Sequence, residues 1–204
     1  MPEEFALYGG TALALHLGHR QSLDFDFFGT RRFDPAKLAA EIPFLVDAEI
    51  TQREANSLTC IIDRDGPVKM SFCGVPGIVR LAPVHRAPDN RLKVASLLDL
   101  AGTTASVVQV RAEAKDDIDS DALITAGLIA LPMALAAAGA IYGQQFNPQI
   151  TLKALSFFDD GNLELLPMAT RLRLAAAARA VDLDALPEIA QIRVQGRSEG
   201  GFEP

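Results

Sequence analysis

Two aspartates near the start of the chain form its clearest chemical pattern. Asp24 and Asp26 flank Phe25 in the run "SLDFDFF", which alternates as a strand does. Because strand side chains repeat every two residues, we expect both carboxylates on one face and the phenylalanine on the other. Like charges this close repel unless a cation neutralises them, and Mg²⁺ or Mn²⁺ accepts such oxygen ligands. The pair predicts a divalent metal site, with a solvated acidic strand face as the alternative.

A glycine-rich turn precedes the aspartates. Gly9 and Gly10 follow the apolar run "FALY" and lead into a helical pattern. Backbone N–H groups at such a turn can bind phosphate oxygens, because no side chain stands in the way. Thr11 is interpreted as the helix N-cap and as a further phosphate ligand. The simpler alternative for two adjacent glycines is a tight turn and nothing more.

Polar residues between the turn and the aspartates extend the candidate phosphate site. Arg20 supplies positive charge, and Ser22 can bond either a phosphate or the turn itself. Arg31 and Arg32 lie further along the chain and are more distant candidates.

A second charged block lies near the middle of the chain. Arg111 precedes the run "KDDID", which contains Lys115, Asp116 and Asp119. The two aspartates are three residues apart and share a helical face, so both can point to one ligand. Acidic residues are also favoured in the first turn of any helix, so a purely capping role is the alternative.

The elements that must position these residues indicate an α/β fold of the α+β type, with a mixed sheet flanked by helices. Strands are expected at 5–8, 23–28, 44–54, 57–63 and 68–74, and early helices near 11–17 and 35–40. Gly18 is expected to end the first helix, Asp34 to cap the second, and "RDGP" to turn a hairpin. From Lys93 onward the pattern is helical, with later helices near 149–158 and 167–181. We therefore expect an α/β core over 1–90, a helical region packed on it over 91–190, and a flexible tail over 191–204.

Composition limits the classes of protein that fit. A net charge of -7 argues against a general nucleic-acid binder. The two cysteines have neither the spacing of a zinc site nor that of a disulfide scaffold, which is typical of a cytoplasmic protein. The three histidines are interpreted as polar residues of the surface or of helix ends. The uncharged stretch from Ala122 to Gly143 has the length of a membrane span. Gly127 and Pro132 interrupt it, so we expect two buried helices and no membrane association.

The motifs together resemble a known family. The string "LYGGTALALHLGHRQSLDFDFF", with Arg111 and "KDDID" downstream, resembles the AbiEii-type nucleotidyltransferase toxins of type IV toxin-antitoxin systems. The resemblance implies a polymerase-beta-like nucleotidyltransferase fold that uses Mg²⁺ or Mn²⁺ and an NTP. It also implies an RNA or protein acceptor and an antitoxin partner. Asp24, Asp26, Asp116 and Asp119 would then be catalytic, while Gly9, Gly10, Thr11, Arg20, Ser22 and Lys115 would bind the nucleotide.

The sequence departs from the family pattern at two positions. Ser71 stands where a later strand usually supplies a third carboxylate, and Thr104 stands where a helix usually supplies a lysine. Asp63 is the alternative source of the third carboxylate. These departures leave two functions open: a nucleotidyltransferase with impaired activity, or an inactive protein of the same fold that binds an NTP or a partner.

Overall fold

The expected mixed sheet forms the first part of the molecule. The computed structural model describes residues 2–126 and 128–189. The strands are β1 (Phe5–Tyr8), β2 (Phe25–Gly29), β3 (Glu49–Glu54), β4 (Ser57–Asp63), β5 (Pro67–Gly74), β6 (His85–Arg86) and β7 (Lys93–Val94). They are arranged in the order β3-β4-β5-β2-β1-β7-β6. The pairs β2–β5 and β1–β7 are parallel and the others antiparallel, which confirms the predicted mixed sheet.

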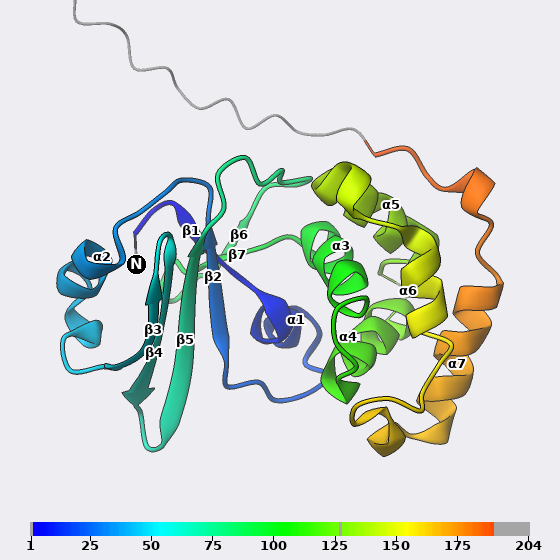
Figure 1. The fold of residues 1–204 in the computed structure, drawn as a ribbon, viewed down its shortest axis with the longest axis horizontal. Helices are drawn as coiled ribbons and strands as arrows, with labels where there is room; N and C mark the ends of the chain where they lie inside the picture. The colour runs from blue at the N-terminus through cyan, green and yellow to red at the C-terminus, as the bar shows by residue number, and fades with distance from the viewer. Residues whose placement is uncertain (1, 127, 190–204) are drawn as a thin grey trace, which may run out of the picture.

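Helices flank this sheet and then continue beyond it. The α-helices are α1 (Gly9–Leu17), α2 (Pro35–Glu41), α3 (Leu97–Val107), α4 (Ala114–Thr125), α5 (Leu131–Tyr142), α6 (Pro148–Ala154) and α7 (Met168–Arg179). Short 3-10 turns are η1 (Pro43–Leu45), η2 (Gly143–Gln145), η3 (Leu163–Leu165) and η4 (Leu183–Ala185). In Figure 1, α2 lies on the outer side of β3 and β4, α1 lies beside β2, and α3 to α7 form a separate layer.

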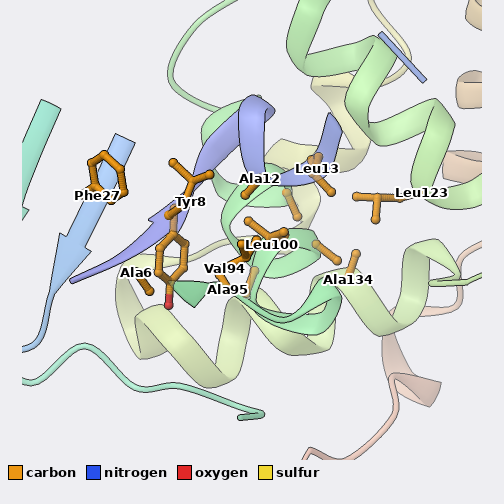
Figure 2. Packing of buried hydrophobic residues seen from close by; sticks show 14 of the residues in the cluster. Ala6, Tyr8, Ala12, Leu13, Phe27, Val94, Ala95, Leu100, Leu123 and Ala134 are labelled. Carbon is orange, nitrogen blue, oxygen red and sulfur yellow. The ribbon is translucent and has the colours of Figure 1, made fainter. Parts of the chain in front are cut away.

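One continuous hydrophobic core joins the sheet to the helical layer. Figure 2 shows Tyr8 and Phe27 of the sheet and Leu13 of α1 in the same cluster as Leu100 of α3 and Leu123 of α4. The cluster extends to Leu174 of α7. Burial of such large apolar side chains is the main source of stability, so the two layers support each other. Side chains between the sheet and the helical layer are therefore held in place by both layers.

Two helix-end signals and one turn signal were predicted correctly. The Asp34 side chain accepts hydrogen bonds from the backbone N–H groups of Ala36 and Lys37, which confirms the predicted cap of α2. Gly18 ends α1 with φ of 62°. The hairpin turn lies between β4 and β5 as expected.

Several predicted boundaries were wrong. Residues 44–47 are not part of a strand, because Pro43 starts the 3-10 turn η1 and β3 begins only at Glu49. Lys93 starts no helix, because β7 pairs with β1 and β6, and Ser96 caps α3. The later helices α6 and α7 are shorter than expected.

The long uncharged stretch is broken as predicted. The helix α4 ends at Thr125 and α5 begins at Leu131, with Pro132 in its first turn. Within the described ranges, none of the helices has both the length and the apolarity of a membrane span. The predicted flexible tail, 191–204, lies outside the described residues.

Candidate active site

A cavity of about 680 Å³ lies between the sheet and the helical layer and brings the two predicted motif blocks together. Its charged lining comprises Arg20, Asp24, Asp26, Arg111, Lys115 and Asp116. Another part of its wall is apolar and contains Leu23, Phe28, Val107, Val110 and Tyr142. This volume is within the range of small-molecule sites, and the mixed wall suits a ligand with one anionic and one apolar part.

The two predicted metal ligands both line this cavity. Asp24 immediately precedes β2 and Asp26 lies within it, opposite Ser71 of the parallel strand β5. Burial raises the pKa of Asp26, and the negative charge of Asp24 adds to the rise. The Ser71 hydroxyl works in the opposite direction through a hydrogen bond to the Asp26 carboxylate. A carboxylate that is costly to ionise beside a second one is the arrangement that a cation would stabilise.

The carboxylates of Asp24 and Asp26 and the hydroxyl of Ser71 are too few ligands to fill the coordination shell of Mg²⁺. They would hold Mg²⁺ only if the substrate supplied further ligands. Mg²⁺ is typically bound by one or two carboxylates together with phosphate oxygens and water. Within residues 2–126 and 128–189, no group of three or more His, Cys, Asp or Glu side chains is arranged to hold a metal ion. The donor set therefore fits a metal that is shared with a phosphate ligand.

Asp63 is in the wrong place to supply a third carboxylate. It pairs with Pro67 at the hairpin end of β4, whereas Ser71 pairs with Thr59. Four residues along a strand correspond to about 13 Å. The Asp63 carboxylate instead accepts a hydrogen bond from the Gly66 N–H in the turn.

The two adjacent glycines are required by close contacts on the cavity wall. Gly9 has φ of 68°, and a Cβ atom there would lie 3.0 Å from Oδ2 of Asp26. A Cβ atom on Gly10 would lie 2.0 Å from Nη2 of Arg20. Gly9 combines a left-handed backbone with this close approach, and a side chain at Gly10 would displace the Arg20 guanidinium. The first turn of α1 therefore lies directly against the predicted site.

Thr11 is not the N-cap of α1, because the left-handed Gly9 lets the helix begin two residues earlier than expected. The Thr11 side chain is buried and is not among the cavity-lining residues. Its hydroxyl lies 2.8 Å from the Ser22 hydroxyl and donates to the carbonyl oxygen of Asp24. Thr11 therefore fastens the loop that carries Asp24, while Ser22 itself lines the cavity.

Two aspartates of the second motif, Asp116 and Asp119, each hold one arginine. The Asp119 carboxylate accepts hydrogen bonds from Nε and Nη2 of Arg20, at 2.6 and 2.8 Å. The Asp116 carboxylate accepts from Nε and Nη2 of Arg111, at 2.7 and 3.0 Å. Both arginines line the cavity, whereas Asp119 does not. Arg111 was expected in a helix, but it lies in the connection between α3 and α4.

The remaining predicted cations differ in position. Lys115 lines the cavity and forms an ion pair of 3.0 Å with Glu113. Arg31 and Arg32 are exposed and are not among the lining residues. Thr104 does not line the cavity either, while its neighbour Thr103 does.

Besides the apolar wall, two polar residues that bear on the site were not predicted from the sequence. His19 was interpreted as surface polarity, yet its Nε2 lies 2.6 Å from Oδ1 of Asp119. Lys69 lies two residues before Ser71 on β5 and therefore shares its face. Its charge is among those that oppose the raised pKa of Asp26. The alternation of β5 could have indicated Lys69, whereas no local signal links His19 to a residue so distant in sequence.

The solved structure of MenT4, a nucleotidyltransferase toxin from Mycobacterium tuberculosis H37Rv, has a similar fold. It matches with a TM-score of 0.55 and 16% sequence identity, over 89% of this chain and 77% of that chain. No curated protein matches the sequence.

The family model described as nucleotidyl transferase AbiEii toxin of a type IV toxin-antitoxin system matches residues 2–192. That match confirms the resemblance seen in the two motif blocks. The chain belongs to the AbiEii family of nucleotidyltransferase toxins.

Proposed function

We propose that this protein is a metal-dependent nucleotidyltransferase that transfers a nucleotidyl group from an NTP to an RNA or protein acceptor. The single observation that carries the proposal is the convergence of Asp24, Asp26, the Gly9–Gly10 turn and two arginines on one cavity. Family membership supports the reaction class and implies an antitoxin partner. NTPs are cytoplasmic substrates, so we place the activity in the cytoplasm.

Asp24 and Asp26 would hold Mg²⁺ or Mn²⁺ together with the phosphate oxygens of the NTP. When bound, the metal would neutralise phosphate charge and favour departure of pyrophosphate. Both carboxylates reach the cavity from β2 or the residue before it, and the Ser71 hydroxyl bonds Asp26 from β5. This chain therefore contributes two charged ligands and one neutral group.

The first turn of α1 and the arginines would bind the triphosphate. The backbone N–H groups at Gly9 and Gly10 lie at the positive end of a helix, which favours phosphate. Arg20, Arg111 and Lys115 add positive charge on the same wall. The apolar wall, with Phe28 and Tyr142, would receive the nucleobase.

In the proposed step, an acceptor oxygen forms a bond to the α-phosphorus and loses its proton to solvent water. The bond from the α-phosphorus to the oxygen that bridges to the β-phosphate breaks, and pyrophosphate leaves. The protein's part is to position the reactants and to stabilise the spread negative charge.

A second candidate function is favoured by the position of Ser71. Where a third carboxylate would be expected, the hydroxyl at this position contributes no charge to a metal. The protein would then bind an NTP, or a partner, without turnover.

The test is incubation of the purified protein with each of the four NTPs, labelled in the α-phosphate, with Mg²⁺ or Mn²⁺ and with RNA or protein acceptors. We expect incorporation of label that Asp24→Ala abolishes. The matched control is Asp34→Ala, which removes an aspartate at the distant α2 cap. NTP binding without incorporation would support the inactive NTP-binding protein. Absence of NTP binding would contradict the enzyme and leave only an inactive protein that binds a partner.

A further inference from the structure

The helix α4 presents two buried carboxylates to two arginines of the active-site cavity. The side chains of Asp116 and Asp119 are 9% and 4% exposed. They are three residues apart on the helix and share one face. Each accepts two hydrogen bonds from a single guanidinium group. Such fork-like pairs fix the orientation of the arginine as well as its charge.

Each arginine keeps donors that its aspartate does not use. A guanidinium group has five N–H donors. Arg111 uses its Nε and Nη2 toward Asp116, and no hydrogen bond from its Nη1 is found within the described part of the chain. Arg20 uses its Nε and Nη2 toward Asp119 and its Nη1 toward the Gln21 carbonyl oxygen, which leaves two N–H groups. The unused donors are available to an anionic ligand in the cavity.

The first turn of α1 fixes where the Arg20 donors lie. A Cβ atom on Gly10 would approach Nη2 of Arg20 to 2.0 Å and Oδ2 of Asp119 to 3.1 Å. The guanidinium therefore lies against the helix N-terminus, where phosphate is favoured by the backbone. His19 contacts Asp119 at 2.6 Å and restrains the same carboxylate.

We propose that Asp116 and Asp119 are positioning residues that hold Arg111 and Arg20 as a two-arginine clamp for a triphosphate, a role that rests on the proposed function. They act through the arginines and neither ligate the metal nor take the acceptor proton. Thr104, at the position where a lysine is usual, does not line the cavity. The two arginines of the clamp supply positive charge there. The ligand class is a polyphosphate with adjacent anionic groups, which two planar guanidinium groups can contact together.

The same helix offers a matched control. Asp121 accepts hydrogen bonds from Nε and Nη2 of Arg173 of α7, so this pair has the geometry of the clamp pairs. Neither residue lines the active-site cavity. Loss of this pair should change stability without changing ligand affinity.

The test measures binding of inorganic tripolyphosphate, with Mg²⁺ present, by titration calorimetry. Asp119→Asn, Asp116→Asn, Arg20→Gln and Arg111→Gln should each weaken binding about tenfold or more. The double variant Asp119→Asn with Arg20→Gln should be no weaker than Arg20→Gln alone, because the aspartate acts only through that arginine. Asp121→Asn should bind as wild type does, with a lower midpoint of thermal unfolding.

Several outcomes would overturn the clamp. The clamp would be wrong if folded Asp119→Asn bound tripolyphosphate as tightly as wild type does. It would also be wrong if the losses of affinity in the double variant were additive, or if Asp116→Asn or Asp119→Asn weakened binding of Mg²⁺ in the absence of tripolyphosphate. Arg20→Gln keeps the test decisive if the buried Asp119→Asn variant fails to fold. If the clamp variants behave as expected but no NTP is transferred, the enzymatic function fails and the clamp stands. If transfer depends on Asp24 but not on the arginines, only the clamp fails.

Discussion

Ser71 lies directly opposite Asp26 across the parallel strands β2 and β5, and its hydroxyl bonds the Asp26 carboxylate. The strand register therefore brings a neutral side chain to the place from which a third carboxylate would reach a metal held by Asp24 and Asp26. Affinity for a divalent cation depends on the number of charged ligands. This one position should thus set how tightly the site holds Mg²⁺.

Ser71→Asp should strengthen Mg²⁺ binding about tenfold, since a third charged ligand would join Asp24 and Asp26. Without metal, the same variant should unfold at a lower temperature because three carboxylates repel one another. Calorimetric titration and thermal unfolding with and without Mg²⁺ measure both effects. Ser71→Asn is the uncharged control, and equal Mg²⁺ affinity in the two variants would count against the metal site.

Asp26→Asn should abolish Mg²⁺ binding yet make the metal-free protein more stable at pH 7. Burial raises the pKa of Asp26, so the folded state holds its proton more tightly than the unfolded state does. Protonated Asp26 stabilises the folded state at low pH, and this stabilisation is lost as pH rises through the pKa of Asp26 in the folded state. Above that pKa, the folded state bears the full cost of a buried negative charge. The unfolding midpoint in EDTA should rise by on the order of a few degrees. Asp63→Asn, in the distant hairpin, should leave Mg²⁺ affinity unchanged.

Lys69→Met should weaken tripolyphosphate binding several-fold at low salt. Lys69 shares a face of β5 with Ser71 and its charge acts on Asp26. Because the lysine is exposed, salt should screen the effect, so the difference from wild type should shrink at high ionic strength. Lys37→Met, on the exposed surface of α2, is the matched control. A loss of affinity that does not respond to salt would contradict this electrostatic role.

Asp117→Asn should stabilise the protein more at pH 8 than at pH 5. Burial, with a further contribution from the charge of Asp116, raises the pKa of Asp117 from 3.8 to about 7. The proton-linked stability is complete below pH 3.8 and is lost as pH rises through about 7. Asparagine has no charge to bury, so its advantage grows over this range to on the order of a few kcal/mol. Chemical denaturation at the two pH values measures it, with exposed Asp159→Asn as control; equal gains at both pH values would refute the assignment.

Local patterns in the sequence predicted the parts of the fold that depend on near neighbours. Asp34, Gly18 and the hairpin before Pro67 were read correctly because caps and turns have their own chemistry. The boundary near Lys93 was missed, since β7 exists only through pairing with β1 and β6. Short strands of this kind have no signal of their own.

The candidate site divides in the same way. The alternation around Asp24 and Asp26 predicted that both carboxylates would lie on one face, and both line the cavity. The attachment of Arg20 to Asp119 could not be predicted, because it depends on how α4 packs against the loop after α1. For the same reason Thr11 was assigned to a phosphate when its hydroxyl bonds the backbone of Asp24.

The Arg20–Asp119 pair joins residues 99 positions apart, and this separation has a consequence for synthesis of the toxin. A ribosome makes Arg20, Asp24 and Asp26 early, and Ser71 later, long before the residue that fixes Arg20. A nascent or prematurely ended chain that stops before Asp119 would carry the proposed metal ligands without an oriented arginine. We therefore expect the cell to be exposed to the proposed activity only once α4 has been made and has packed against the sheet.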